Sequence, residues 1–267
     1  MIERFLPHNA RPVCLLALLC LAPALAAALE CNPVTFREIH STVCRVDLRT
    51  DHLQLFLYDG AGMPYRSLRR LADSLRAQPE QLAFAMNAGM FREDYSPLGL
   101  LIMNGRQVHR INLATGFGNF YMKPNGVFVL TTVGAQIVES SQYSSVEDPV
   151  ILATQSGPML VSAGVIHPGL NPQGTSRNIR NGIGVMNANE VVFAITDEPV
   201  TFYEFALLFR DRLKCPDALY LDGSVSSLYV PSLGRDDEHS SIGPIIGVTV
   251  PTRDTPTRSS RAPGPSR

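Results

Sequence analysis

The chain has almost no excess of charge of either sign: 23 lysine and arginine residues face 24 acidic residues, for a formal net charge of −1. It has no basic run outside its extreme C-terminus, which argues against nucleic acid as the main partner, because phosphate backbones are bound by concentrated positive charge. The Gly-x-Ser-x-Gly elbow, the His-Glu-x-x-His pair and the glycine-rich phosphate-binding loop are all absent. His109, His167 and His239 are scattered rather than spaced as ligands, which disfavours a zinc hydrolase.

Residues 13–28 read VCLLALLCLAPALAAA and carry no charge, and two arginines precede them. This run is short of the roughly 20 apolar residues that a membrane-spanning helix needs, and it ends in small residues suited to cleavage. Neither Cys20 nor Cys31 follows the small residue that a lipoprotein signal requires. We therefore predict that residues 1–28 are a signal peptide and that the mature protein is periplasmic or secreted, with no membrane span.

Cleavage would leave Cys31, Cys44 and Cys215 in an oxidising compartment. Cys31 and Cys44 are close enough in sequence to close a short loop, and we predict a disulfide between them. Three buried thiols are the alternative. No pair has the spacing of a zinc finger or a redox motif.

The rest of the chain alternates short β-rich runs with turn signals. Asn104-Gly105 and Asn125-Gly126 are typical of turns, and shorter signals occur at 162–164 and 187–190. Helical spacing is found at 67–77 and 202–213. The hydrophobic content of 45% is enough for a core. We predict one α+β domain over residues 29–252, built on mixed or antiparallel sheets with a few packed helices, and a disordered tail over 253–267.

One stretch, residues 219–230 (LYLDGSVSSLYV), places polar residues between two apolar β-rich runs. Asp222 is therefore expected at the end of a strand, with Gly223 allowing close backbone approach and Ser224 and Ser226 supplying hydroxyls. This pattern favours a site for a polar substrate. A plain Asp-Gly hairpin is the alternative.

Other polar residues also stand where apolar runs begin or end, among them Asn87, Gly157, Arg180 and Asp197. Arg180 precedes the IGV run and Asp197 follows the FAIT run, so the hairpin between them could bring both to one end of a sheet. Three of them have a structural alternative: a turn at Asn87, a surface charge at Arg180 and a loop residue at Asp197. Their recurrence at strand ends favours one shared site.

The order MNAGMF, SGPMLV, IRNGIGV and YLDGSVSSLYV resembles the phosphodiester glycosidase family over roughly residues 53–250. The family's Asn-Gly-Gly-Phe-Phe-like motif matches at 87–91, its Gly-Gly-Pro motif at 156–158, and its arginine before Ile-Gly at Arg180. Its Leu-Asp-Gly-Gly-Gly-Ser motif matches at 221–226, where Ser224 and Val225 replace glycines. These replacements indicate a bacterial branch with a narrower or differently shaped site.

The resemblance implies an exported hydrolase that cleaves the glycosidic bond of a sugar-1-phosphodiester in an envelope or extracellular glycan. Such a reaction needs carboxylates near the anomeric carbon and a cation for the phosphate. The carboxylates expected to be catalytic are Asp222, Asp197 and Glu93. The residues expected to bind substrate are Arg180 and Lys123 at the phosphate, and Asn87, Gly157, Gly223, Ser224 and Ser226.

No organic cofactor is expected, and a divalent metal stays open. Two other functions fit the same residues. One is a metal-dependent phosphodiesterase that uses Asp197 and Asp222 as ligands. The other is a periplasmic module that binds a glycan or phosphosugar without catalysis.

Overall fold

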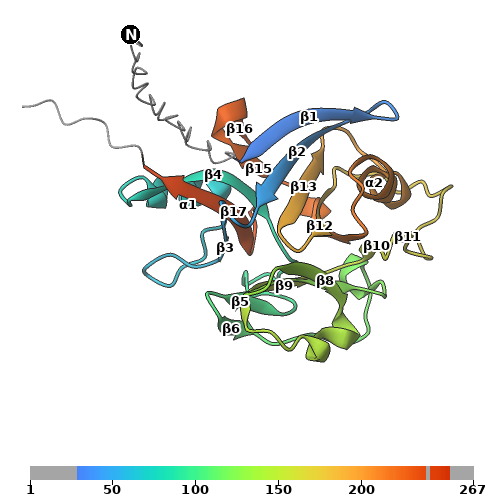
Figure 1. Ribbon diagram of the computed structural model, residues 1–267, viewed down its shortest axis with the longest axis horizontal. Coiled ribbons are helices and arrows are strands. Elements are labelled where there is room, and N and C mark those ends of the chain that lie inside the picture. Colours follow the sequence, from blue (N-terminus) through green and yellow to red (C-terminus); the bar gives the residue numbers. More distant parts are fainter. Residues whose placement is uncertain (1–28, 239–240, 253–267) are drawn as a thin grey trace, which may run out of the picture.

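The structure is a computed structural model that describes residues 29–238 and 241–252 (Figure 1). Its strands form three antiparallel sheets, with two short helices packed against them. The prediction of antiparallel sheets with few helices is confirmed, although the fold is more strongly β than the α+β class implies. The predicted signal peptide (1–28) and C-terminal tail (253–267) lie outside the described residues.

The largest sheet has seven strands in the order β1-β2-β13-β12-β14-β10-β11. Their bounds are β1 Glu30–Phe36, β2 Ile39–Asp47, β13 Glu190–Thr196, β12 Asn181–Asn187, β14 Asp217–Tyr220, β10 Met159–Ser162 and β11 Val165–Ile166. Cys31 and Cys44 are directly opposite each other in β1 and β2, and a disulfide joins them. Cys215 is a buried free thiol.

The other two sheets have five strands each, in the orders β16-β15-β4-β17-β3 and β6-β5-β9-β7-β8. The first consists of β16 Arg235–Asp236, β15 Leu228–Val230, β4 Glu80–Asn87, β17 Ile245–Pro251 and β3 His52–Phe56. The second consists of β6 Arg106–His109, β5 Leu101–Met103, β9 Val150–Ser156, β7 Gly126–Thr131 and β8 Ala135–Glu139. Figure 1 shows the second of these sheets below the other two.

The main core lies where the three sheets face one another. Phe84 of β4, Phe128 of β7 and Phe193 of β13 are fully buried in one apolar cluster, so each sheet contributes a face to it. A second cluster lies between the seven-stranded sheet and α2 (Phe202–Leu207). Within the two described ranges, no helix combines the length and the apolar character needed to cross a membrane.

Local sequence signals explain both helices. Helix α1 (Leu68–Leu75) begins after Ser67, whose side chain accepts from the Arg70 amide. Helix α2 begins with the expected capping box between Thr201 and Glu204, and continues as a wider π-helical turn over Leu208–Arg212. The predicted helical segments are therefore confirmed, with shorter bounds at 67–77.

Candidate functional site

Asp222 lies at the junction between two sheets. Strand β14 ends at Tyr220 in the seven-stranded sheet, and β15 begins at Leu228 in the sheet that contains β4. A short 3-10 turn, Gly223–Val225, follows Asp222. The prediction of strand, turn and strand is confirmed. The hairpin alternative is wrong, because β14 and β15 belong to different sheets.

Asn87, at the buried end of β4, holds this junction together. Its Nδ2 donates to the carbonyl of Asp222 at 2.8 Å. Its Oδ1 accepts from the Ser227 amide and from Nδ2 of Asn181, both at 2.9 Å. Asn87 is 2% exposed, so an unpaired amide here would be costly. The structure therefore makes Asn87 a support for the backbone around Asp222 rather than a plain turn residue.

The Asp222 carboxyl group is half-buried, and its Oδ1 accepts from Ser224 Oγ at 2.8 Å. Burial raises its pKa above the ordinary aspartate value, and the hydrogen bonds from Ser224 only partly oppose this effect. Among the described residues, no arginine, lysine or histidine forms an ion pair with it. A carboxyl group with a raised pKa and no counter-ion is suited to proton transfer.

The Tyr220 side chain holds the turn in place through its hydroxyl group. Its Oη accepts from the Gly223 amide at 2.7 Å, and its ring meets Phe202 edge-on with centroids 4.7 Å apart. Burial raises the pKa of Tyr220 to about 12, so the phenol stays protonated at neutral pH. A Cβ at position 223 would overlap the Tyr220 hydroxyl, which explains why glycine follows Asp222.

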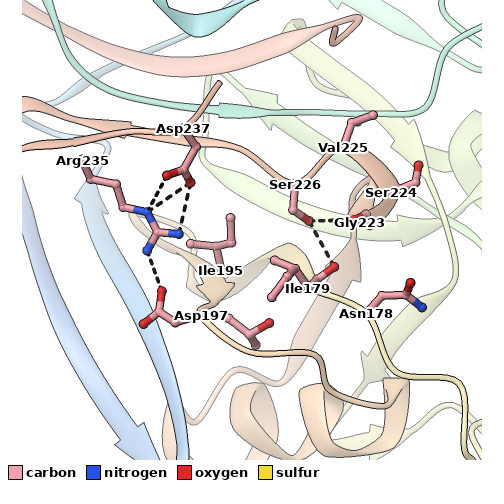
Figure 2. A pocket seen from close by; sticks show the side chains of 11 residues that line it. Asn178, Ile179, Ile195, Asp197, Gly223, Ser224, Val225, Ser226, Arg235 and Asp237 are labelled. Carbon is pink, nitrogen blue, oxygen red and sulfur yellow. Dashed lines mark hydrogen bonds and ion pairs between the residues drawn. The ribbon is translucent and has the colours of Figure 1, made fainter. Parts of the chain in front are cut away.

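A cavity of ≈ 400 Å³ opens beside this turn (Figure 2). Four of the predicted site residues line it, namely Asp197, Gly223, Ser224 and Ser226. The other lining residues are Asn178, Ile179, Ile195, Thr196, Val225, Arg235 and Asp237. Asp222 is not a lining residue, but Ser224, which donates to its carboxylate, is one.

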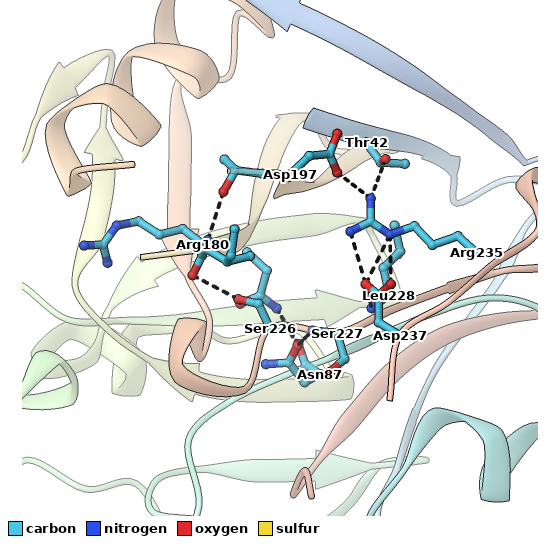
Figure 3. A network of polar contacts seen from close by, with 12 residues as sticks. Thr42, Asn87, Arg180, Asp197, Ser226, Ser227, Leu228, Arg235 and Asp237 are labelled. Carbon is cyan, nitrogen blue, oxygen red and sulfur yellow. Dashed lines mark hydrogen bonds and ion pairs between the residues drawn. The ribbon is translucent and has the colours of Figure 1, made fainter. Parts of the chain in front are cut away.

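Arg235 is the cation of this cavity. Its Nη1 donates to Asp197 Oδ1 and to Thr42 Oγ1, both at 2.7 Å, and its Nη2 is 3.1 Å from Asp237 Oδ2 (Figure 3). Two carboxylates therefore share one guanidinium, and the cavity is net negative. Sequence reasoning missed Arg235 and Asp237. The only signal was a charged run after an apolar strand, and such runs are usually solvated.

Arg180 is 1% exposed and does not line the cavity. Its Nε donates to the Val200 carbonyl at 2.9 Å and its Nη2 to the Ser176 carbonyl at 3.1 Å. The guanidinium carbon lies 3.6 Å from the centroid of the Phe202 ring. Figure 3 shows this side chain extending away from Arg235. The surface-charge alternative is wrong, and the phosphate-binding role is not supported, because the side chain is buried against Phe202 and does not line the cavity.

The backbone at Arg180 does lie where the sequence placed it. The Thr196 amide donates to the Arg180 carbonyl at 3.0 Å, and the Asn181–Ile195 pair follows. Arg180 and Asp197 therefore flank the same end of the β12–β13 hairpin. Their side chains lie in different regions: Asp197 lines the cavity, and Arg180 contacts the start of α2.

Three predicted residues lie elsewhere. Glu93 is exposed in the loop between β4 and β5. Lys123 donates from Nζ to the Leu113 carbonyl at 2.9 Å. A Cβ at Gly157 would lie 2.6 Å from Asn125 Cβ, so glycine is needed there for close packing. None of the three lines the cavity, and among the described residues no group of three or more His, Cys, Asp or Glu is placed to hold a metal ion.

Comparison with known proteins identifies the family. The model of the phosphodiester glycosidase family matches residues 80–250. The uncharacterized protein YigE of Escherichia coli (strain K12) is 34% identical over 212 residues, which cover 79% of this chain and 83% of YigE.

Two solved structures share the fold. The catalytic domain of zebrafish N-acetylglucosamine-1-phosphodiester alpha-N-acetylglucosaminidase, auto-inhibited by its pro-peptide, has a TM-score of 0.59 at 13% identity over 86% of this chain and 84% of that one. A hypothetical protein from Synechocystis has a TM-score of 0.50 at 16% identity over 83% of this chain and 62% of that one. The family model spans more than half of the chain, so the chain belongs to the phosphodiester glycosidase family.

Proposed function

We propose that the protein is an exported hydrolase that cleaves the glycosidic bond of a sugar-1-phosphodiester in a cell-envelope or extracellular glycan. Membership of the family supports a hydrolase. The observation that carries the assignment is the Asp222 carboxyl group, which is half-buried, has a raised pKa and has no counter-ion among the described residues. It lies beside a cavity whose serine, carboxylate and backbone groups can bind sugar hydroxyls.

In this proposal Asp222 acts at the anomeric carbon. A phosphate is already a good leaving group and needs little proton donation, so the main requirement is a carboxylate that activates water or stabilises developing positive charge. Asp197 and Asp237 accept hydrogen bonds from sugar hydroxyls. Arg235 faces the phosphate, which replaces Asp197 as the partner of its Nη1.

Isotope labelling identifies the bond that breaks. The protein is incubated with a sugar-1-phosphodiester in ¹⁸O-water, and both products are analysed by mass spectrometry. Glycosidic cleavage places the label on C1 of the sugar and leaves the phosphate unlabelled, whereas cleavage of the P–O bond labels the phosphate. Label in the phosphate, with loss of turnover on adding a chelator, would instead support a metal-dependent phosphodiesterase. Binding without turnover would support a binding module.

The variant Asp222→Asn tests the residue. Asparagine can still accept the hydrogen bond from Ser224, so we expect a folded protein with an unchanged circular dichroism spectrum. It cannot take a proton or carry negative charge, so turnover should fall by about 10² to 10⁴. The control is Asp73→Asn on α1, which is outside the lining of the cavity and should keep full activity. Wild-type turnover by Asp222→Asn would refute the catalytic assignment.

A further inference from the structure

A second cavity, of ≈ 450 Å³, lies at the edge of the sheet that contains β5 and β6. Its lining residues are Arg92, His109, Arg110, Ile111, Asn112 and Leu113. They include two arginines and no carboxylate, whereas the cavity beside Asp222 has two carboxylates for one arginine. Positive charge is therefore concentrated in this cavity, and no lining residue carries a negative charge that would balance it.

Arg92 uses only its Nη1 in hydrogen bonds: it donates to the Pro97 carbonyl, to Ser96 Oγ and to His109. Among the described residues its Nε and Nη2 have no hydrogen-bond partner and remain for a ligand. His109 Nδ1 lies 2.9 Å from the Gly99 carbonyl and 3.0 Å from the Arg110 carbonyl, so Nδ1 carries the proton. His109 Nε2 then accepts from Arg92 Nη1 at 3.3 Å. Within the described part of the chain, neither Arg92 nor Arg110 forms an ion pair with a carboxylate. Most other guanidiniums in pockets of this protein do, as at Arg45 and Arg235.

A third cation, Lys123, contacts one residue of the lining without lining the cavity itself. Lys123 Nζ donates to the carbonyl of Leu113, a lining residue, at 2.9 Å. An ammonium has three donors, so two remain for a ligand. Lys123 was expected to bind phosphate, and the structure places it in contact with Leu113 of this cavity and not in the lining of the cavity beside Asp222.

We propose that this cavity binds a phosphate group. Phosphate presents several acceptor oxygens in different directions, which suits two guanidiniums and an ammonium approaching from separate segments, whereas a carboxylate presents two oxygens in one plane. The site is distinct from the cavity beside Asp222 because the two share no lining residue.

The two sites are nevertheless joined through β9. Gln155 Oε1 accepts from the Asn112 amide at 2.9 Å, and its Nε2 donates to the Asn112 carbonyl at 2.7 Å. The next residue, Ser156, donates from Oγ to the Leu221 carbonyl at 2.7 Å. We infer that the phosphate is one of several in a glycan with repeated phosphodiesters, and free inorganic phosphate is the other source of the same ligand. This choice of ligand source rests on the proposed function, and phosphate binding itself does not.

Nuclear magnetic resonance with inorganic phosphate tests the binding site. Phosphate is titrated at constant ionic strength while the His109 ring resonances, identified with His109→Gln, report on the cavity. We expect saturable shifts in the wild-type protein and at least about tenfold weaker binding in Arg92→Gln/Arg110→Gln, because two charge-assisted contacts are lost. The control is Arg106→Gln, an exposed arginine on β6 outside the cavity, which should bind as the wild type does. Equal affinity in the double variant, or equal weakening in Arg106→Gln, would overturn the proposal.

Kinetics then distinguish the sources of the phosphate. With an oligomer that contains several phosphodiesters, the double variant should raise KM about tenfold and leave kcat unchanged. With a substrate that has one phosphodiester, both constants should match the wild type. An unchanged KM for the oligomer would overturn the polymer assignment in favour of free phosphate. If neither substrate is hydrolysed by the wild type, the proposed function fails, while the resonance titration still decides the phosphate site.

Discussion

The turn after Asp222 depends on the absence of a side chain at Gly223. The Gly223 amide donates to Tyr220 Oη at 2.7 Å, and a Cβ at this position would overlap that hydroxyl. It would also lie 2.9 Å from Tyr220 Cζ and 3.0 Å from the Ile179 carbonyl. Gly223→Ala should therefore push Tyr220 and the turn apart and break the hydrogen bond between them.

The cost of each change follows from these contacts. Overpacking a buried site costs about 1 to 3 kcal/mol, and the lost hydrogen bond adds about 1 kcal/mol. Tyr220→Phe keeps the ring against Phe202 but leaves the buried Gly223 amide without an acceptor, which costs about 1 to 3 kcal/mol. The Gly223→Ala/Tyr220→Phe double variant loses this hydrogen bond only once, and it no longer has the hydroxyl that the alanine Cβ would overlap. It should therefore be less destabilised than the sum of the single variants by at least about 1 kcal/mol.

Urea unfolding of the four proteins measures this coupling. Gly60→Ala is the control, since a Cβ there meets nothing within 4 Å, and its free energy of unfolding should stay within about 0.5 kcal/mol of the wild type. An additive cycle, or a Gly223→Ala protein as stable as the wild type, would refute the role assigned to Tyr220.

Three further predictions concern individual residues. Because burial raises the pKa of Asp222 above its ordinary value of 3.8, kcat/KM should rise with pH as this carboxyl group ionises. Between the ordinary pKa and the raised pKa, the free energy of unfolding should fall with rising pH in the wild type but not in Asp222→Asn. Arg180→Lys should lower the free energy of unfolding in urea by about 1 to 3 kcal/mol, because lysine cannot reproduce both carbonyl contacts and the stacking on Phe202. An unchanged free energy of unfolding with weakened substrate binding would return Arg180 to a phosphate role. Mass mapping should find Cys31 linked to Cys44, and reduction should cost about 3 kcal/mol; two free thiols in the unreduced protein would contradict this.

The features that sequence reasoning predicted correctly are local ones. Asn104 and Gly105 both have positive φ, at 50° and 72°, as the turn between β5 and β6 requires. The capping box of α2 and the β12–β13 hairpin are also determined by neighbouring residues. The position of Asp222 at the end of a strand follows from the same kind of pattern.

The features that it missed depend on contacts between distant segments. Arg235 reaches the cavity through the pairing of β15 with β16, a strand of two residues that has no periodic signal. The direction of Arg180 is set by the Val200 carbonyl and the Phe202 ring, which come from the start of α2 rather than from its own strand. Whether a charged side chain faces a cavity or the interior is decided by such partners, and residue order alone does not specify them.

The contacts around Asp222 support its backbone while leaving its charge unbalanced. Ser156 donates to the carbonyl of Leu221, Asn87 to the carbonyl of Asp222, and Tyr220 accepts from the amide of Gly223. Three successive residues are thus held by neutral partners from three different strands. A single arginine against the carboxylate would have favoured its charged form and lowered its pKa. The neutral partners fix the position of the carboxylate and let burial raise its pKa, which is the combination that a proton-accepting carboxylate requires and a turn residue does not.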